Sequence, residues 1–266
     1  MSKRSLVTSL VTSLATSLAG ALALTGLAAC GSDDSSGGAG DSGSVTLRVF
    51  AAASLTESFT ELGRQFEKEH PGTKVELNFG PSSGLAEQIT SGAPADVFAS
   101  ASPSNMDTLV SAGDAEDPKD FATNSMEIAT PPDNPAKVAG VDDLAEPGVK
   151  VALCQAQVPC GKVAAEVFAN AGLTVTPVTE EVDVKSVLTK VTLGEVDAGV
   201  VYVTDVLAAG DKVKGVQIPA DVNASTTYPI ATLGGSKHAD EAAEFVDLVL
   251  SDAGTSELEK AGFRSP

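Results

Sequence analysis

The chain has 266 residues, of which 36 are acidic and 17 are basic, so its formal net charge at pH 7 is −19. This balance argues against a nucleic-acid partner, because binding to phosphate backbones depends on clustered Lys and Arg. Aromatic residues make up 4% of the chain and Trp is absent, so neither a base-stacking platform nor an aromatic shelf for sugars is indicated.

Residues 1–29 have the pattern of an export signal. Lys3 and Arg4 supply a positive start, and an apolar stretch rich in Ser, Thr, Ala and Leu follows. The sequence LAAC at 27–30 is typical of bacterial lipoprotein processing, so we expect Cys30 to carry lipid. The alternative is a plain secretory signal with an incidental cysteine. We expect the mature protein to lie outside the cytoplasm, lipid-anchored to the cell membrane.

The segment at residues 30–44 is expected to be a flexible tether behind the lipidated cysteine. After Cys30 it contains only Gly, Ser, Asp and Ala. Such a composition buries no apolar surface. No later segment of the sequence is long and apolar enough to span a bilayer. We therefore expect the folded part of the protein to begin near residue 45.

Strand and helix patterns alternate along the rest of the chain. Alternating or continuous apolar runs predict strands at 45–50, 75–79, 95–99, 149–153 and 199–203. Helical spacing predicts helices at 55–66 and 85–89, from near 161, from near 183, at 242–249 and around 258. This alternation predicts an α/β fold with a mostly parallel sheet and helices on both faces. Ligands of such sheets bind beyond the carboxyl ends of the strands.

The junction between the first predicted strand and helix is FAAASLTE at residues 50–57. Ser54, with Glu57 three residues later, is typical of a capping box. Small residues that lead into a capped helix expose free backbone N–H groups, which suits an anion. An ordinary N-cap on a surface helix is the alternative. Comparable junctions or strand ends lie at Ser82, Cys160, Val184 and Tyr202, and their spread along the chain suits a site between two lobes.

Two cysteines, Cys154 and Cys160, remain once Cys30 is lipidated. Their short spacing and the oxidising compartment favour a disulfide. A free thiol pair or a metal site are the alternatives. A metal site has weak support, because the histidines, His70 and His238, lie far from both cysteines in sequence.

Neither Asp96 nor Ser54 indicates an enzyme. Asp96 is better explained as an acceptor for backbone amides than as a general base. Ser54 has no recurring His motif to serve as its base. We therefore expect no catalytic residue, no resident metal and no cofactor.

Five motifs occur in a specific order: FAAASL at 50–55, FGPSSGLAEQI at 79–89, GAPADVFASA at 92–101, VPCG at 158–161 and AGVVY at 198–202. In this order, over residues 45–263, the chain resembles the molybdate-binding proteins of bacterial ABC importers. Two positions depart from the pattern. Cys160 stands where related proteins often carry Ala, and Pro81 removes one possible amide and stiffens its turn.

The resemblance implies a two-lobed periplasmic-binding-protein fold of type II, with the ligand cleft between the lobes. One lobe would comprise residues 45–122 and 229–266, and the other residues 123–228. The implied function is to capture molybdate or tungstate by hydrogen bonds and deliver it to a membrane ABC permease, acting as a monomer. Carried over by position, the hydroxyl ligands are Ser54, Ser82 and Tyr202, and the backbone N–H ligands are Ala53, Ser82, Cys160 and Val184.

An anion site without Lys or Arg at these positions is physically reasonable in an acidic protein. A helix N-terminus presents roughly +0.5 charge at contact distance, while the long-range field is screened over ~8 Å. Hydrogen bonds to a charged partner are also about twice as strong as neutral ones.

Donor-only sites favour fully deprotonated oxyanions, because a protonated phosphate would also need an acceptor. Sulfate meets the same condition. A receptor of the same fold for sulfate, thiosulfate or a metal chelate is therefore the nearest alternative. An α/β hydrolase is a more distant one, and an adhesion or structural lipoprotein would bind no small ligand tightly.

Overall fold

The computed structural model describes residues 44–266. The predicted export signal, the lipidation of Cys30 and nearly all of the tether lie outside the described residues. Within them, no helix has the length and apolar character needed to cross a membrane.

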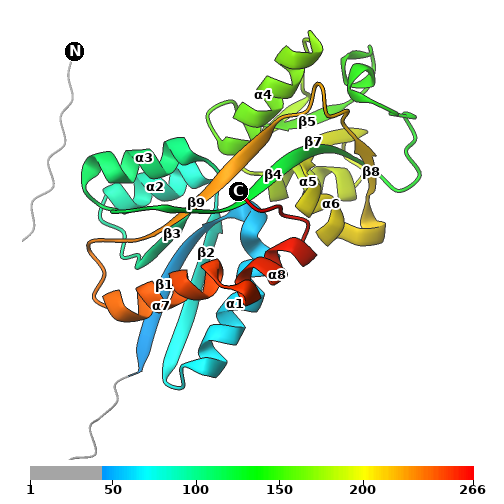
Figure 1. The fold of residues 1–266 in the computed structure, drawn as a ribbon. Coiled ribbons are helices and arrows are strands. Elements are labelled where there is room, and N and C mark those ends of the chain that lie inside the picture. Colours follow the sequence, from blue (N-terminus) through cyan, green and yellow to red (C-terminus); the bar gives the residue numbers. More distant parts are fainter. Residues whose placement is uncertain (1–43) are drawn as a thin grey trace, which may run out of the picture. The chain divides into compact units, whose positions relative to one another are not determined.

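The strands of residues 44–266 form one mixed sheet in the order β2-β1-β3-β9-β4-β7-β5-β6, with β8 paired to β4 (Figure 1). Their bounds are β1 Val45–Ala52, β2 Thr73–Gly80, β3 Val97–Ala99, β4 Lys119–Thr130, β5 Val151–Cys154, β6 Thr179–Glu181, β7 Ala198–Tyr202, β8 Lys214–Gln217 and β9 Ser225–Thr232. Strands β2, β1 and β3 are mutually parallel, and so are β6, β5 and β7. These two parallel groups agree with the sequence prediction.

Two long antiparallel strands, β4 and β9, join the two parallel groups. Residues 119–125 of β4 pair with β9, whereas residues 126–130 pair with β7 and β8. In Figure 1 the two strands run side by side across the middle of the fold. Neither strand was predicted from the sequence. Strand β9 contains Pro229, which weakens a strand pattern, and β4 changes its partners along its length.

The helices are α1 Thr56–Glu69, α2 Ser82–Thr90, α3 Pro103–Ala112, α4 Pro159–Ala171, α5 Val184–Thr192, α6 Val203–Ala209, α7 Ala239–Leu250 and α8 Asp252–Lys260. Short 3₁₀ turns occupy Ala53–Leu55, Val141–Ala145 and Gly210–Lys212. Helices α3 and α6 were not predicted from the sequence. The predicted helices near 161 and 183 begin at Pro159 and Val184.

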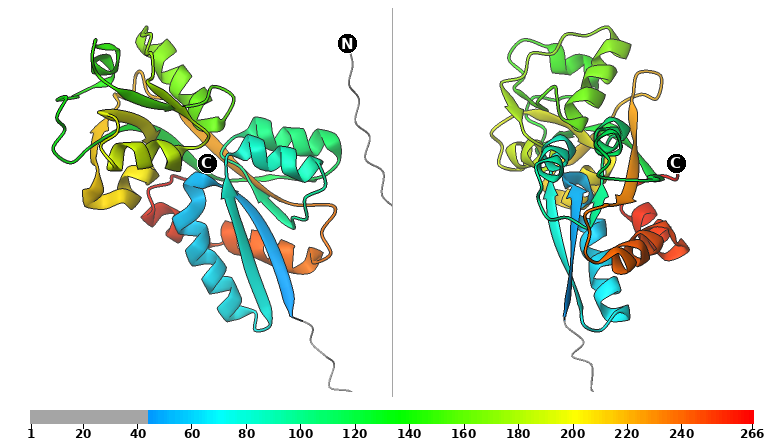
Figure 2. Two further views of the ribbon diagram at one scale, coloured as in Figure 1. Left: turned by 180° about the vertical axis from the view of Figure 1, so that it is seen from behind. Right: turned by 90° about the vertical axis from the view of Figure 1, so that its left-hand side faces the viewer.

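Alternation along β1 supplies two hydrophobic cores on opposite faces of the sheet. Leu47 and Val49 pack with Phe59, Phe66 and other residues of α1, α7 and α8. Phe50 faces the other way and packs with residues of α2 and α3. The paired strands β1 and β2 and the neighbouring α1 are seen from two further directions in Figure 2. We call this part of the fold, built on β1, β2, β3 and β9, the first lobe.

A separate hydrophobic core is formed by residues between Met126 and Ile218. It packs α4 and α5 against β4, β5 and β7. We call this part the second lobe. The fold is therefore two-lobed, and the precise residue at which one lobe passes into the other stays a prediction.

Candidate functional site

A small cavity lies between the two lobes. The first lobe lines it with residues 52–54, 80–82 and 101, and the second lobe lines it with residues 158–160, 183–184 and 202. All six residues predicted for the site are among them: Ala53, Ser54, Ser82, Cys160, Val184 and Tyr202. The structure thus brings together residues as far apart in the sequence as Ala53 and Tyr202.

The size of the cavity restricts what it can hold. Its volume is about 20 Å³. One water needs roughly 10–15 Å³. In this conformation the cavity has room for a small group of a few atoms.

Four helical turns begin at residues that line the cavity. Ser82 begins α2, Cys160 lies in the first turn of α4, Val184 begins α5, and Ala53 begins the 3₁₀ turn that leads into α1. The first N–H groups of a helix have no acceptor within the helix, and its N-terminus carries partial positive charge. Such a convergence of helix starts suits an anion.

Helix α5 owes its start to Asp183, whose Oδ1 accepts the N–H of Ser186 at 2.8 Å. This N-cap turns the Asp183 carboxylate toward its own helix, which begins at the cavity-lining residue Val184. None of the described residues that line the cavity is Lys or Arg.

Ser82 is buried, and its Oγ accepts the backbone N–H of Ala101 at 3.0 Å. Because an amide N–H can only donate, this contact leaves the Ser82 hydroxyl proton free for another acceptor. Pro81 is the residue before α2 and has φ −64°, which is the angle that its ring imposes. Pro81, which departs from the family pattern, is therefore compatible with the start of α2 at Ser82.

Ser54 does not form the predicted capping box, and this part of the sequence prediction is wrong. Helix α1 begins at Thr56 after Leu55, without a side-chain cap. Ser54 lies inside the preceding 3₁₀ turn, and its Oγ is 2.8 Å from the hydroxyl of Tyr228. The Glu57 carboxylate instead accepts from Lys185. Partners from distant segments have thus replaced the local cap.

Tyr202 ends β7 with its side chain 1% exposed. Among the described residues, no group makes a hydrogen bond with its hydroxyl. Burial, with Tyr228 and Asp205 nearby, raises the pKa of Tyr202 well above its usual value, so the hydroxyl keeps its proton. An unmade hydrogen bond of a buried group costs about 1–3 kcal/mol. A ligand that accepts this proton would remove that cost.

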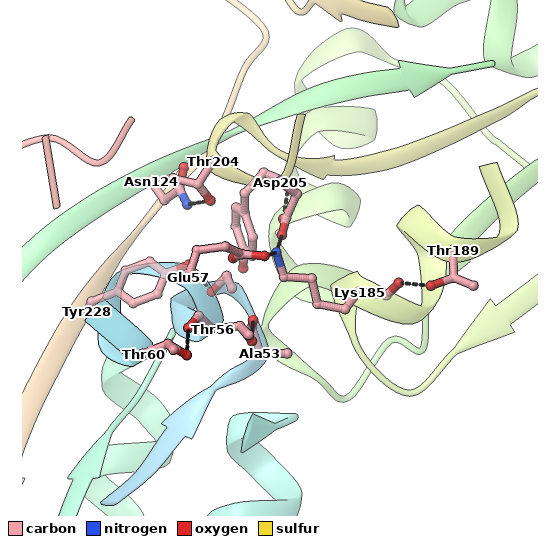
Figure 3. Close-up of polar contacts among 12 residues, drawn as sticks. Ala53, Thr56, Glu57, Thr60, Asn124, Lys185, Thr189, Thr204, Asp205 and Tyr228 are labelled. Atoms are coloured by element: carbon pink, nitrogen blue, oxygen red, sulfur yellow. Dashed lines mark hydrogen bonds and ion pairs between the residues drawn. The ribbon is translucent and has the colours of Figure 1, made fainter. Parts of the chain in front are cut away.

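Lys185, Glu57 and Asp205 form an ion cluster between α5, α1 and α6 (Figure 3). Lys185 Nζ is 2.9 and 2.8 Å from the carboxylate oxygens of Glu57, and 3.1 Å from Asp205 Oδ1. Asp205 is fully buried and also accepts the N–H of Tyr202 at 3.1 Å. Burial raises the pKa of Asp205 to about 6, although the neighbouring Lys185 opposes the shift. Burial lowers the pKa of Lys185, but the two carboxylates outweigh it and leave a net increase.

Tyr228 and Asp205 were not among the residues predicted for the site. Tyr228 is one of only two tyrosines in the chain, which was the available signal for it. Asp205 occupies the third position of α6, where acidic residues commonly stabilise a helix N-terminus. Its contact with Lys185 could not be read from that pattern.

Cys154 and Cys160 form the disulfide that their spacing favoured, with a Cα–Cα distance of 5.8 Å. It ties the end of β5 to the first turn of α4, and so holds the segment that presents the Cys160 N–H. In residues 44–266, no group of three or more His, Cys, Asp or Glu side chains is arranged to hold a metal.

Asp96 lies outside the cavity lining and is buried. Its Oδ2 accepts the N–H of Arg48 and its Oδ1 accepts the hydroxyl of Ser236, both at 2.7 Å. These contacts agree with the expectation that Asp96 accepts a backbone amide.

Comparison with known proteins gives the same fold and places the chain in a family. Residues 47–264 match the family described as bacterial extracellular solute-binding protein. The chain belongs to this family. Members of it are solute-binding proteins that act outside the cytoplasm, and the present chain has their two-lobed fold.

One relative in this family is the molybdate-binding protein ModA of Mycobacterium tuberculosis. It is 42% identical over 249 residues, which cover 92% of this chain and 95% of the relative. Among solved structures, the periplasmic molybdate-binding protein of Azotobacter vinelandii has a TM-score of 0.73 at 21% identity, covering 83% of this chain and 99% of that one. The sulfate-binding protein SubI of Mycobacterium tuberculosis also has a TM-score of 0.73, at 18% identity, covering 83% and 87%. At these identities, the two structures support the fold alone.

Proposed function

We propose that the protein captures molybdate or tungstate in the cavity between its lobes and delivers the ion to an ABC permease in the membrane. The observation that carries the proposal is the lining of the cavity: it includes the first residues of four helical turns, together with the hydroxyl-bearing residues Ser54, Ser82 and Tyr202. A tetrahedral dianion can accept from all of them. The 42% identical molybdate-binding relative supports this choice of ligand.

In the proposed complex, Ser54, Ser82 and Tyr202 donate through their hydroxyls. Ala53, Ser82, Cys160 and Val184 donate through their backbone N–H groups. The protein acts as a monomer and not as an enzyme, and the lipid on Cys30 holds it at the outer face of the membrane. The lobes, at residues 45–122 with 229–266 and at 123–228, hinge where β4 and β9 pass between them.

Sulfate is the second candidate ligand. A site of amide and hydroxyl donors serves any fully deprotonated tetrahedral oxyanion, and SubI shows that this fold also occurs in a protein named for sulfate. Only the fit of the cavity to the larger molybdate ion separates the two ligands.

Calorimetric titration of the mature protein, stripped of ligand by unfolding and refolding, tests the proposal. Molybdate and tungstate should bind tightly with one-to-one stoichiometry, whereas sulfate and phosphate should bind weakly or not at all. Folded protein that binds no molybdate would refute the proposed ligand, and tight sulfate binding with weak molybdate binding would favour the second candidate.

Two substitutions test the site itself. Ser54→Ala and Ser82→Ala should each weaken molybdate binding by about 1–3 kcal/mol, because each leaves a charged acceptor without its donor. Ser83→Ala is the matched control, since Ser83 lies in the same turn of α2 but does not line the cavity. Unchanged affinity in both site variants would overturn the assignment.

A further inference from the structure

We propose that Tyr228 is a positioning residue that sets the specificity of the site, by donating its hydroxyl proton to Ser54 Oγ and thereby directing the Ser54 proton at the bound anion. This inference rests on the proposed function. Tyr228 does not line the cavity. It acts on the ligand only through Ser54.

The hydroxyl groups of Tyr228 and Ser54 are in close contact and buried. Tyr228 OH lies 2.8 Å from Ser54 Oγ, and the two side chains are 0% and 4% exposed. Tyr228 is on β9 and Ser54 is in the turn after β1, 174 positions earlier. Because both hydroxyls are buried, the direction of the hydrogen bond between them matters.

Either hydroxyl could donate in this pair, and a bound anion decides between the two directions. If Ser54 donated to Tyr228, only lone pairs of Ser54 would face the anion. If Tyr228 donates to Ser54, the Ser54 proton is free to meet the anion, and both hydroxyl protons have an acceptor. Burial raises the pKa of Tyr228 above its usual value, so the hydroxyl keeps the proton that this arrangement needs.

Ser82 shows the same arrangement with an unambiguous donor. Its Oγ accepts the N–H of Ala101, and an amide can only donate. The Ser82 proton is thereby left for the cavity. In the proposed arrangement, Tyr228 donates to Ser54 Oγ in the same way as the Ala101 amide donates to Ser82 Oγ.

Aromatic packing holds the Tyr228 ring in place without help from its hydroxyl. Phe121, Tyr202 and Phe263 lie around it in edge-to-face contacts, at centroid distances of 6.2, 6.3 and 5.2 Å. Edge-to-face aromatic pairs at these distances are favourable. Tyr228→Phe therefore removes the donor and keeps the packing, which makes it a clean test.

The proposed role has a consequence for specificity. With Tyr228 present, one lone pair of Ser54 accepts the Tyr228 proton and the Ser54 proton is directed at the anion. Ser54 therefore meets a protonated oxyanion such as hydrogen phosphate as a donor and not as the acceptor for that ion's own proton. Without the Tyr228 hydroxyl, Ser54 can reverse and accept from the anion. The variant should lose affinity for molybdate and lose part of its discrimination against phosphate.

The test is calorimetric titration of wild-type, Tyr228→Phe, Ser54→Ala and double-variant protein with sodium molybdate and with inorganic phosphate at neutral pH. We expect Tyr228→Phe to weaken molybdate binding about 2–10-fold, the scale of one net hydrogen bond. The ratio of molybdate to phosphate affinity should fall. In the Ser54→Ala background, Tyr228→Phe should cause no further change, because its route to the ligand is already absent.

Phe263→Leu is the control for packing. It disturbs the ring contact and leaves the hydroxyl pair, so it should not change the ratio of molybdate to phosphate affinity. Equal molybdate affinity of wild type and Tyr228→Phe, or an equal loss with and without Ser54, would overturn the role of Tyr228. Wild-type protein that binds no molybdate would overturn the proposed function itself, and this inference with it.

Discussion

The ammonium group of Lys185 lies 2.8 Å from a carboxylate oxygen of Glu57 and joins α5 of the second lobe to α1 of the first. Each partner is close to a cavity residue in sequence. Lys185 follows Val184, and Glu57 lies three residues after Ser54. A second contact between the lobes involves α4, which also begins at the cavity. Lys162 Nζ of α4 lies 3.3 Å from Ser104 Oγ of α3. The described conformation is thus one in which side chains beside the site link the lobes.

Glu57→Ala should increase the rate at which molybdate dissociates. The Glu57 side chain is 51% exposed, so its pair with Lys185 contributes about 0.2–1 kcal/mol, as exposed pairs do. When the conformation with linked lobes loses this free energy, molybdate should dissociate about 1.5–5-fold faster. Stopped-flow measurement of dissociation checks this. Glu61→Ala is the matched control, because Glu61 pairs with Arg64 of the same helix. Equal rates in the two variants would count against a link between the lobes.

Asp205→Asn should change how stability depends on pH. The pKa of Asp205 is raised to about 6 from 3.8, so the native state binds this proton at a higher pH than the unfolded chain does. As pH falls from about 7 to about 4, protonation of Asp205 therefore increases the free energy of unfolding, by up to about 1.4 kcal/mol per pH unit. Asn keeps an acceptor for the Tyr202 N–H and does not titrate.

Urea unfolding of wild type and Asp205→Asn across this pH range isolates the contribution of the carboxyl group. The stability of the wild type relative to the variant should rise toward acid pH. A constant difference would show that Asp205 does not titrate in this window.

Removal of the disulfide should weaken both the fold and the site. In the chain-entropy description, a bridge across so short a loop contributes roughly 2 kcal/mol. The double variant Cys154→Ala/Cys160→Ala should lose stability on that scale, and it should bind molybdate less tightly because the Cys160 N–H is less firmly held. Urea unfolding and calorimetry measure the two effects. Wild type refolded under reductant should match the variant, and the variant itself should not respond to reductant.

Gly161→Ala should also disturb the first turn of α4, which the disulfide holds through Cys160. A Cβ at Gly161 would collide with the backbone carbonyl of Gln155 and lie 3.0 Å from the carbonyl oxygen of Cys154. Backbone cannot move aside as a flexible side chain can, so we expect a loss of about 1–3 kcal/mol in stability and weaker molybdate binding. Gly140→Ala is the control, since nothing lies within 4 Å of its Cβ and its φ is −166°. Similar behaviour of the two variants would contradict the steric argument.

Most of the elements that position the cavity could be predicted because their signals are local. Strand β1 alternates apolar residues, and Asp183 and Pro159 mark the starts of α5 and α4 at the residues where a helix tolerates them. Strands β4 and β9 were not predicted. Strand β4 changes its partners along its length, and Pro229 interrupts the strand pattern of β9. The capping box at Ser54 was wrong because Tyr228 offers that hydroxyl a buried partner.

Local sequence signals were enough to place most of the helix starts at the cavity and the small or hydroxyl-bearing residues beside them. Which groups these residues meet depends on the tertiary fold. Ser54 meets Tyr228 across 174 positions, and Lys185 meets Glu57 across 128. Periodicity and caps depend on neighbours within a few residues, whereas the partner of a buried polar group depends on which distant segments the packed cores bring together. The residues that line the cavity could therefore be predicted from the sequence, but the partners of their hydroxyl groups and the ion pair that links the lobes could not.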